Sequence, residues 1–234
     1  MNLDISNHPL LPSDDELTPW QQCVKNAIIG VHSRWAPYKL DGGGGATRTV
    51  YWKGPNDSRR AVILKAKNPV HTYCNGVTNE IFFDAWTQWL ADYPESSFGI
   101  KEAKELRAYF VVWDKEHPGS AAGLLWLADQ EPCYEFLEVT DWTDDILNAP
   151  FGTFVQMQFS RRGPEDGHSV VLLGSGKYRG EDVVYVYSSN NFYDKKWKYS
   201  KDQEPGPGWD FYFMNRVRDG FKRIFHAASI DNED

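Results

Sequence analysis

The chain has 234 residues, of which 41% are hydrophobic and 25% charged, as in ordinary folded domains. Its net charge of −8, without a strongly basic stripe, argues against nucleic acid or anionic membrane surfaces as partners. No run approaches the roughly 20 apolar residues of a membrane span.

The three cysteines, Cys23, Cys74 and Cys133, cannot all pair with one another, which excludes a disulfide framework. A bridge between Cys23 and Cys133 that leaves Cys74 free stays open. Cys23 falls on the apolar face of an expected helix, and we interpret it as a small buried hydrophobic residue.

Residues 1–17 are polar with scattered prolines and form a lead-in to the single domain that we expect over residues 1–234. They lack the basic start and apolar core of a signal peptide. Two locations stay open: secreted or periplasmic if a leader was removed, and cytoplasmic otherwise. We expect a monomer.

The first expected helix covers residues 19–34. Thr18 to Gln21 resemble a capping box with Pro19 in the first turn. Apolar residues follow at spacings of four and three, in one stripe: Trp20, Val24, Ile28, Val31 and Trp35. The glycine run 42–45 then breaks regular structure, and no Lys-Ser/Thr follows it as in a phosphate-binding loop.

A hairpin is expected next, with strands over residues 49–53 and 60–65. Gly54-Pro55-Asn56-Asp57 between them is a strong turn signal. A group of basic residues occurs here, offset by acids elsewhere in the chain, and we interpret it as a solvated face: Lys53, Arg59, Arg60, Lys65 and Lys67.

A broad apolar face predicts a central helix from Cys74, with its apolar stripe running to Trp89. Further helices are expected over residues 103–113 and 120–127. Runs rich in Val, Tyr and Phe then predict strands over residues 153–159, 169–173, 183–187 and 209–215. Helices followed by strands indicate an α+β fold, with N-terminal helices packed on an antiparallel sheet.

Cys74 is the residue that most suggests chemistry. Asn75-Gly76 is poor helix interior, which favours a shaped turn that presents the thiol at the helix start. A helix N-terminus and a nearby imidazolium both lower a cysteine's pKa, and the thiolate is the nucleophile. Backbone N–H groups of this turn, at Asn75, could also bind an oxyanion.

His168 is the candidate base. Gly167 precedes it and an apolar strand follows, so we expect its ring at an edge of the sheet, facing the helix. A polar residue on the next strand would orient the imidazole. We choose Asn190 for this role, and Ser188 and Ser189 remain open because the strand register is uncertain by one.

His71, three residues before Cys74, is an alternative base or metal ligand. A zinc site would need more ligands than these histidines and Cys74 supply, and we expect no metal and no cofactor.

Four segments resemble the NlpC/P60 cysteine peptidases, in family order. Residues 35–38 resemble the Pro-Tyr stretch before that family's glycines, and residues 74–78 resemble its Cys-Ser-Gly nucleophile motif. Residues 151–155 lie where the family has Pro-Gly-Asp-Leu-Val, and residues 167–174 resemble its Gly-His strand.

The resemblance implies a papain-like core and cleavage of peptide bonds in bacterial cell-wall peptides. It implies Cys74 as nucleophile, His168 as base, and Tyr38 as a ring beside the thiol that shapes the oxyanion site. We therefore predict a cysteine amidase or endopeptidase that acts on peptidoglycan peptides through an acyl-enzyme. An acyltransferase or deamidase with the same two residues, and a non-catalytic papain-like module that binds glycan or peptide with its aromatic rings, are the alternatives.

Overall fold

The computed structural model describes residues 5–38, 45–53, 56–92, 102–104, 134–138, 146–158, 167–189, 206–214 and 221–227. Two long helices come first, with a short hairpin between them, and the larger sheet follows. Their bounds are η1 (Asp14–Glu16), α1 (Pro19–Ser33), β1 (Val50–Trp52), β2 (Ala61–Leu64), α2 (Cys74–Asp92), β3 (Tyr134–Glu138), β4 (Phe154–Gln158), β5 (Gly167–Tyr178), β6 (Glu181–Ser188), β7 (Gly208–Phe213) and β8 (Phe221–Ala227).

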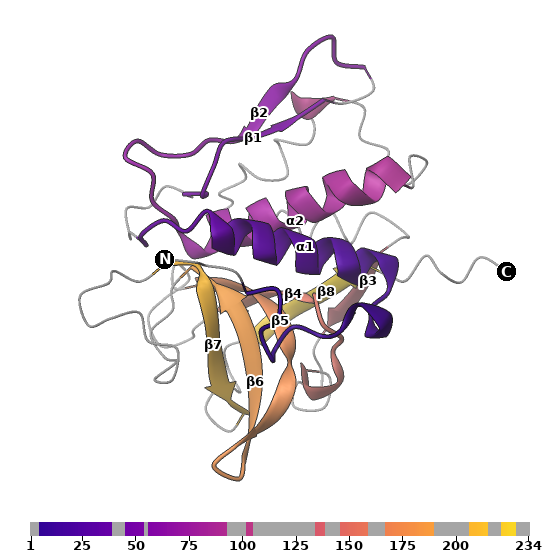
Figure 1. The fold of residues 1–234 in the computed structure, drawn as a ribbon, viewed down its shortest axis with the longest axis vertical. Helices are drawn as coiled ribbons and strands as arrows, with labels where there is room; N and C mark the ends of the chain where they lie inside the picture. Colours follow the sequence, from indigo (N-terminus) through magenta and orange to yellow (C-terminus); the bar gives the residue numbers. More distant parts are fainter. Residues whose placement is uncertain are drawn as a thin grey trace, which may run out of the picture.

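The larger sheet is antiparallel, with the strand order β3-β8-β4-β5-β6-β7. Helices α1 and α2 lie side by side across it, and the β1–β2 hairpin lies beyond α2 (Figure 1). This arrangement of helices and an antiparallel sheet confirms the α+β class. No helix in the described ranges is long and apolar enough to cross a membrane.

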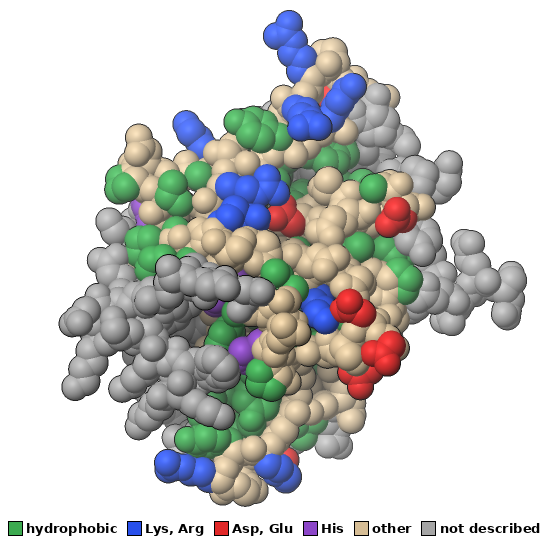
Figure 2. Space-filling view, in the orientation of Figure 1, with side chains coloured by type: hydrophobic (Ala, Val, Ile, Leu, Met, Phe, Trp, Pro, Cys, Tyr) green, Lys and Arg blue, Asp and Glu red, His purple; other side chains and the backbone are tan. Residues whose placement is uncertain are grey.

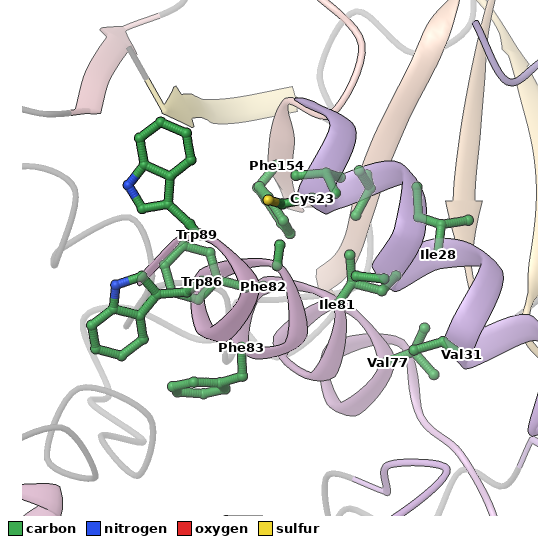
Figure 3. Close-up of a cluster of buried hydrophobic side chains, with 14 of the residues drawn as sticks. Cys23, Ile28, Val31, Val77, Ile81, Phe82, Phe83, Trp86, Trp89 and Phe154 are labelled. Atoms are coloured by element: carbon green, nitrogen blue, oxygen red, sulfur yellow. The ribbon is translucent and has the colours of Figure 1, made fainter. Parts of the chain in front are cut away.

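The main core lies where α1, α2 and the sheet meet. Val31 faces Val77 across the two helices, and Phe82 meets Phe154 of β4 edge to face, at 5.6 Å between ring centroids (Figure 3). Each of these side chains is almost completely buried. A second core cluster is formed by Ile146, Val155, Val170, Leu172, Val184, Val186 and Met214.

The predicted start of α1 is confirmed. The Thr18 hydroxyl accepts the Gln21 N–H at 3.3 Å, and the Gln21 side chain accepts the Thr18 N–H at 3.0 Å, with Pro19 as the first helical residue. Cys23 on this helix is buried and free, so the bridge to Cys133 is not formed. Cys133 itself lies outside the described residues.

The hairpin and the start of α2 are also confirmed. Of the two further helices expected, the one over 103–113 is described only at Ala103 and Lys104, which are helical, and the one over 120–127 lies outside the described residues. Strands β3 and β8 were not predicted. Strand β5 continues to Tyr178, past a register shift at Gly174, whose φ of 137° favours glycine.

Candidate active site

Cys74 is the first residue of α2, as the turn Asn75-Gly76 predicts. The Tyr73 carbonyl accepts the Val77 N–H at 3.0 Å, which closes the first turn, and the Thr78 hydroxyl donates to the Cys74 carbonyl at 2.9 Å. The thiol is free, and the residue is only 4% exposed. A free cysteine therefore lies at the positive end of a helix dipole, closed off from solvent.

The protonation state of this thiol differs from the sequence-based prediction. Burial raises the pKa of Cys74 to about 11, although hydrogen bonds from the backbone of Ser169, of Asn75 and of Cys74 itself lower it. Three backbone groups thus favour the thiolate, and the loss of solvation outweighs them. In this structure Cys74 is a neutral thiol at pH 7.

The segment before Cys74 is held by Thr72. Its N–H donates to the Pro37 carbonyl at 2.7 Å, beside an isolated parallel bridge between Tyr38 and Thr72. The Thr72 hydroxyl donates to the Ala36 carbonyl at 3.1 Å and accepts the Ser189 hydroxyl at 2.6 Å. Residues from three distant parts of the chain therefore fix the approach to the nucleophile.

A close approach of two backbones fixes the other side of the turn. The Gly45 carbonyl accepts the Tyr73 N–H at 2.9 Å and lies against Gly76, where a Cβ atom would overlap it. The residues after Gly45 are anchored on α2, since Glu80 accepts the N–H and hydroxyl of Thr47 at 2.6 and 2.7 Å. Packing against Gly45 thus requires glycine at position 76, two residues after the cysteine.

His168 is the second residue of β5, next to Ser169, whose backbone reaches the sulfur. We expected His168 at an edge of the sheet. Strand β5 instead lies between β4 and β6, so His168 is on a central strand, near the end of that strand. Side chains alternate along a strand, which places His168 on the face that carries Val170 of the second core cluster, away from the helices.

The histidine is 7% exposed, and burial lowers its pKa to about 4. Its imidazole is therefore neutral at pH 7, as a base must be. Between these two described residues the structure has no hydrogen bond from the Cys74 thiol to the His168 ring. The structure brings Cys74 to the residue beside His168 and leaves the two side chains unconnected.

Of the three candidates for the orienting residue, Asn190 lies outside the described residues. The Ser188 hydroxyl donates to the Ser169 carbonyl at 2.9 Å, and the Ser189 hydroxyl donates to Thr72. Both serine hydroxyls are buried, and their donated protons join β6 to β5 and to the segment before Cys74. Their visible role is to position the nucleophile's surroundings.

Tyr38 forms a backbone bridge with Thr72, two residues before Cys74. Its ring stacks on that of Tyr73, with centroids 5.7 Å apart and planes 11° apart. Its pKa is raised, chiefly by burial and then by the charge that Cys74 would carry. The pKa of Tyr212 on β7 is also raised by burial, by Asp210 and by Cys74, so this tyrosine belongs to the thiol's surroundings. The alternating pattern of residues 209–215 in the sequence did not indicate that Tyr212 lies near Cys74.

Asn75 is buried next to Cys74, and its side-chain oxygen has no hydrogen-bond partner. A buried carboxamide with an open acceptor is costly and is suited to a ligand N–H. His71 is buried as well, and its Nδ1 donates to the Pro69 carbonyl at 3.0 Å. No group of three or more His, Cys, Asp or Glu in the described ranges is placed to hold a metal ion.

No protein-family model, curated protein or solved structure matches this chain.

Proposed function

We propose that this protein is a cysteine amidase or endopeptidase with Cys74 as its nucleophile and a papain-like arrangement of helix and sheet. One observation carries the proposal: the sulfur lies at the start of α2, where backbone groups of Asn75 and of Ser169 both favour its anion. The substrate class, amide bonds in bacterial cell-wall peptides, follows from the resemblance to NlpC/P60 peptidases.

In the proposed reaction the Cys74 sulfur attacks the scissile carbonyl carbon while its proton passes to His168. The C–N bond then breaks, and the same proton goes to the leaving amine. Water, deprotonated by His168, attacks the thioester and releases the acid and the thiol. In this mechanism the backbone N–H of Asn75 donates to the oxyanion, and the oxygen of its side-chain carboxamide accepts an N–H of the substrate.

This mechanism requires the His168 ring to approach Cys74 when substrate binds. His168 lies on the face of β5 away from the helices, so the start of β5 must rearrange before the two side chains can meet. This placement favours a second function, a papain-like module that binds cell-wall peptide without cleaving it. An acyltransferase or deamidase would share the first half of the reaction.

The test is the release of amines and peptides from purified peptidoglycan sacculi, measured by mass spectrometry. We expect release by the wild type and by Cys23→Ala, whose cysteine is equally buried but lies in the main core. We expect none above background from Cys74→Ala or His168→Ala. Cleavage by Cys74→Ala at the wild-type rate would overturn the assignment of the nucleophile.

The products separate the alternatives. Hydrolysis gives free acids with the mass of one added water, whereas transfer to an added amine gives a product carrying that amine. Binding to sacculi without any release, by wild type and Cys74→Ala alike, would support the binding module instead.

A further inference from the structure

The β1–β2 hairpin and its flanks carry a charge opposite to that of the whole chain. Residues 45–73 contain six basic residues and one acidic residue, a net charge of +5 in a chain of net −8. One of the six, Arg48, forms ion pairs with Asp84 and Glu80 of α2, so its charge is neutralised. The other five form what we call the hairpin cations: Lys53, Arg59, Arg60, Lys65 and Lys67.

These cations are presented to solvent. All are exposed except Lys67, which is half-buried, and no ion pair among the described residues involves any of them. The one acid of the hairpin, Asp57, accepts the Ala103 N–H at 2.7 Å, so its carboxylate is engaged with the chain. Figure 2 shows several Lys and Arg side chains at the top of the molecule, where Figure 1 has the hairpin, and others in the middle and at the bottom; most of the visible acidic side chains lie below the top.

The turn between β5 and β6 is a second exposed hairpin, and its charges balance. Lys177 pairs with Asp182 at 2.6 Å, and Arg179 lies 5.4 Å from the centre of the Tyr178 ring. Two bases there are matched by two acids, because Glu181 precedes Asp182. Within the described ranges, no acidic side chain is paired with the hairpin cations in this way.

The hairpin is also packed against α2. Trp52 on its inner face stacks on Trp86 of α2, with ring centroids 5.5 Å apart. On the outer face Tyr51 is 53% exposed and lies opposite Val62. The chain then runs from β2 past Lys65, Lys67 and the exposed Val70 directly into Cys74. In the sequence, Lys67 is therefore seven residues from Cys74.

We propose that the hairpin cations dock the carboxylate-bearing peptide chains of the polymer whose amide bonds Cys74 attacks. This rests on the proposed function, since cell-wall peptides supply the carboxylates. The charge density favours this partner over nucleic acid. Five cations on one hairpin match carboxylates that are spaced along peptides, whereas a DNA duplex carries about one negative charge per 1.7 Å. The acidic remainder of the surface would repel so dense a polyanion.

The experiment is cosedimentation of the Cys74→Ala protein with purified peptidoglycan sacculi at low and high salt. The variant Arg59→Gln/Arg60→Gln/Lys65→Gln is made on that background. Its matched control is Lys177→Gln/Arg179→Gln, which removes charge from the other hairpin. We expect about tenfold weaker binding for the triple variant, as for the loss of three exposed ion pairs, and less than twofold change for the control.

Sacculi whose carboxylates have been converted to amides should bind the unaltered hairpin as weakly as native sacculi bind the triple variant. High salt should abolish the difference between the proteins, because exposed charges are screened. Equal binding by the triple and control variants, or equal binding to amidated sacculi, would overturn the proposal. So would tighter binding to duplex DNA than to sacculi at the same salt.

Failure of this inference and failure of the proposed function give different results. With Cys74 intact, the triple variant should cleave a short soluble cell-wall peptide as the wild type does, if the hairpin only docks the polymer. If the wild type cleaves sacculi and the triple variant binds them as well as the unsubstituted hairpin does, the proposal about the hairpin is wrong and the catalytic proposal stands. Charge-dependent binding without any cleavage rejects the catalytic function alone.

Discussion

The close approach of Gly45 and Gly76 gives the sharpest test of the site's architecture. In Gly76→Ala the new methyl group would overlap the Gly45 carbonyl and come within 3.0 Å of the Gly45 nitrogen. All these atoms are backbone, so no side chain can turn aside, and the two segments must separate. Overpacking of this kind costs about 1–3 kcal/mol.

Separation would also weaken the hydrogen bond from the Tyr73 N–H to Gly45, which contributes about 1 kcal/mol. We therefore expect a loss of about 3 kcal/mol in the free energy of unfolding, or about 6–12 °C in the melting temperature for a chain of this size. Urea unfolding followed by tryptophan fluorescence measures the first quantity, and thermal unfolding the second.

Gly30→Ala is the matched control. A methyl group there would meet only the end of the Arg34 side chain, at 3.3 Å, and alanine is the better helix former by about 1 kcal/mol. Its stability should equal or slightly exceed that of the wild type. If Gly76→Ala unfolds within 0.5 kcal/mol of wild type, roughly the size of a neutral surface change, the packing described around Cys74 is wrong.

Three further predictions concern buried ionisable groups. Glu80→Gln should lower the free energy of unfolding by about 1–3 kcal/mol, because an amide NH₂ would face a donor of Thr47, whereas exposed Asp182→Asn should change it little in urea unfolding. The free energy of unfolding should fall between pH 6.5 and 4, since the unfolded chain takes up protons before the buried histidines do; His168 should contribute about 3 kcal/mol, and His32, whose pKa is also lowered by burial to about 4, a similar amount. His168→Gln should remove about half of this pH dependence, and an unchanged dependence would contradict the lowered pKa of His168. Iodoacetamide should label Cys74 at pH 7.5 at least 100-fold more slowly in the folded protein than in urea, and an apparent pKa below 8.5 by mass spectrometry would refute the burial argument.

Local patterns in the sequence predicted the elements that carry the candidate site. The capping box at Thr18 and the turn at Asn75-Gly76 act within a few residues, and both helices begin where these signals place them. Strand β8 was missed because its pairing is remote: it lies between β3 and β4, and its Lys222-Arg223 pair interrupts the apolar run. Sheet partners far away in the chain decide such strands.

The properties of the site were harder to predict than its position. The helix end and the backbone N–H groups that favour a Cys74 thiolate are local, and the sequence indicates them. Burial is a property of the whole fold, and it reverses the direction of the pKa shift. Likewise, the packing reason for Gly76 lies 31 residues away at Gly45, and the hydroxyls of Ser188 and Ser189 turn out to join separate segments.

These pKa values constrain how the proposed reaction can proceed. With Cys74 at about 11 and His168 at about 4, moving the proton from thiol to imidazole in the resting structure costs about 10 kcal/mol, at 1.36 kcal/mol per unit. A turnover of one per second allows a total barrier of only about 17 kcal/mol. The proton transfer alone would take up more than half of that barrier, so catalysis at this rate is favoured by a substrate that ends the burial of both side chains, after which the backbone groups around the sulfur lower the pKa of the thiol. The binding module requires no such change, which is why cleavage, lost in His168→Ala, is the decisive observation.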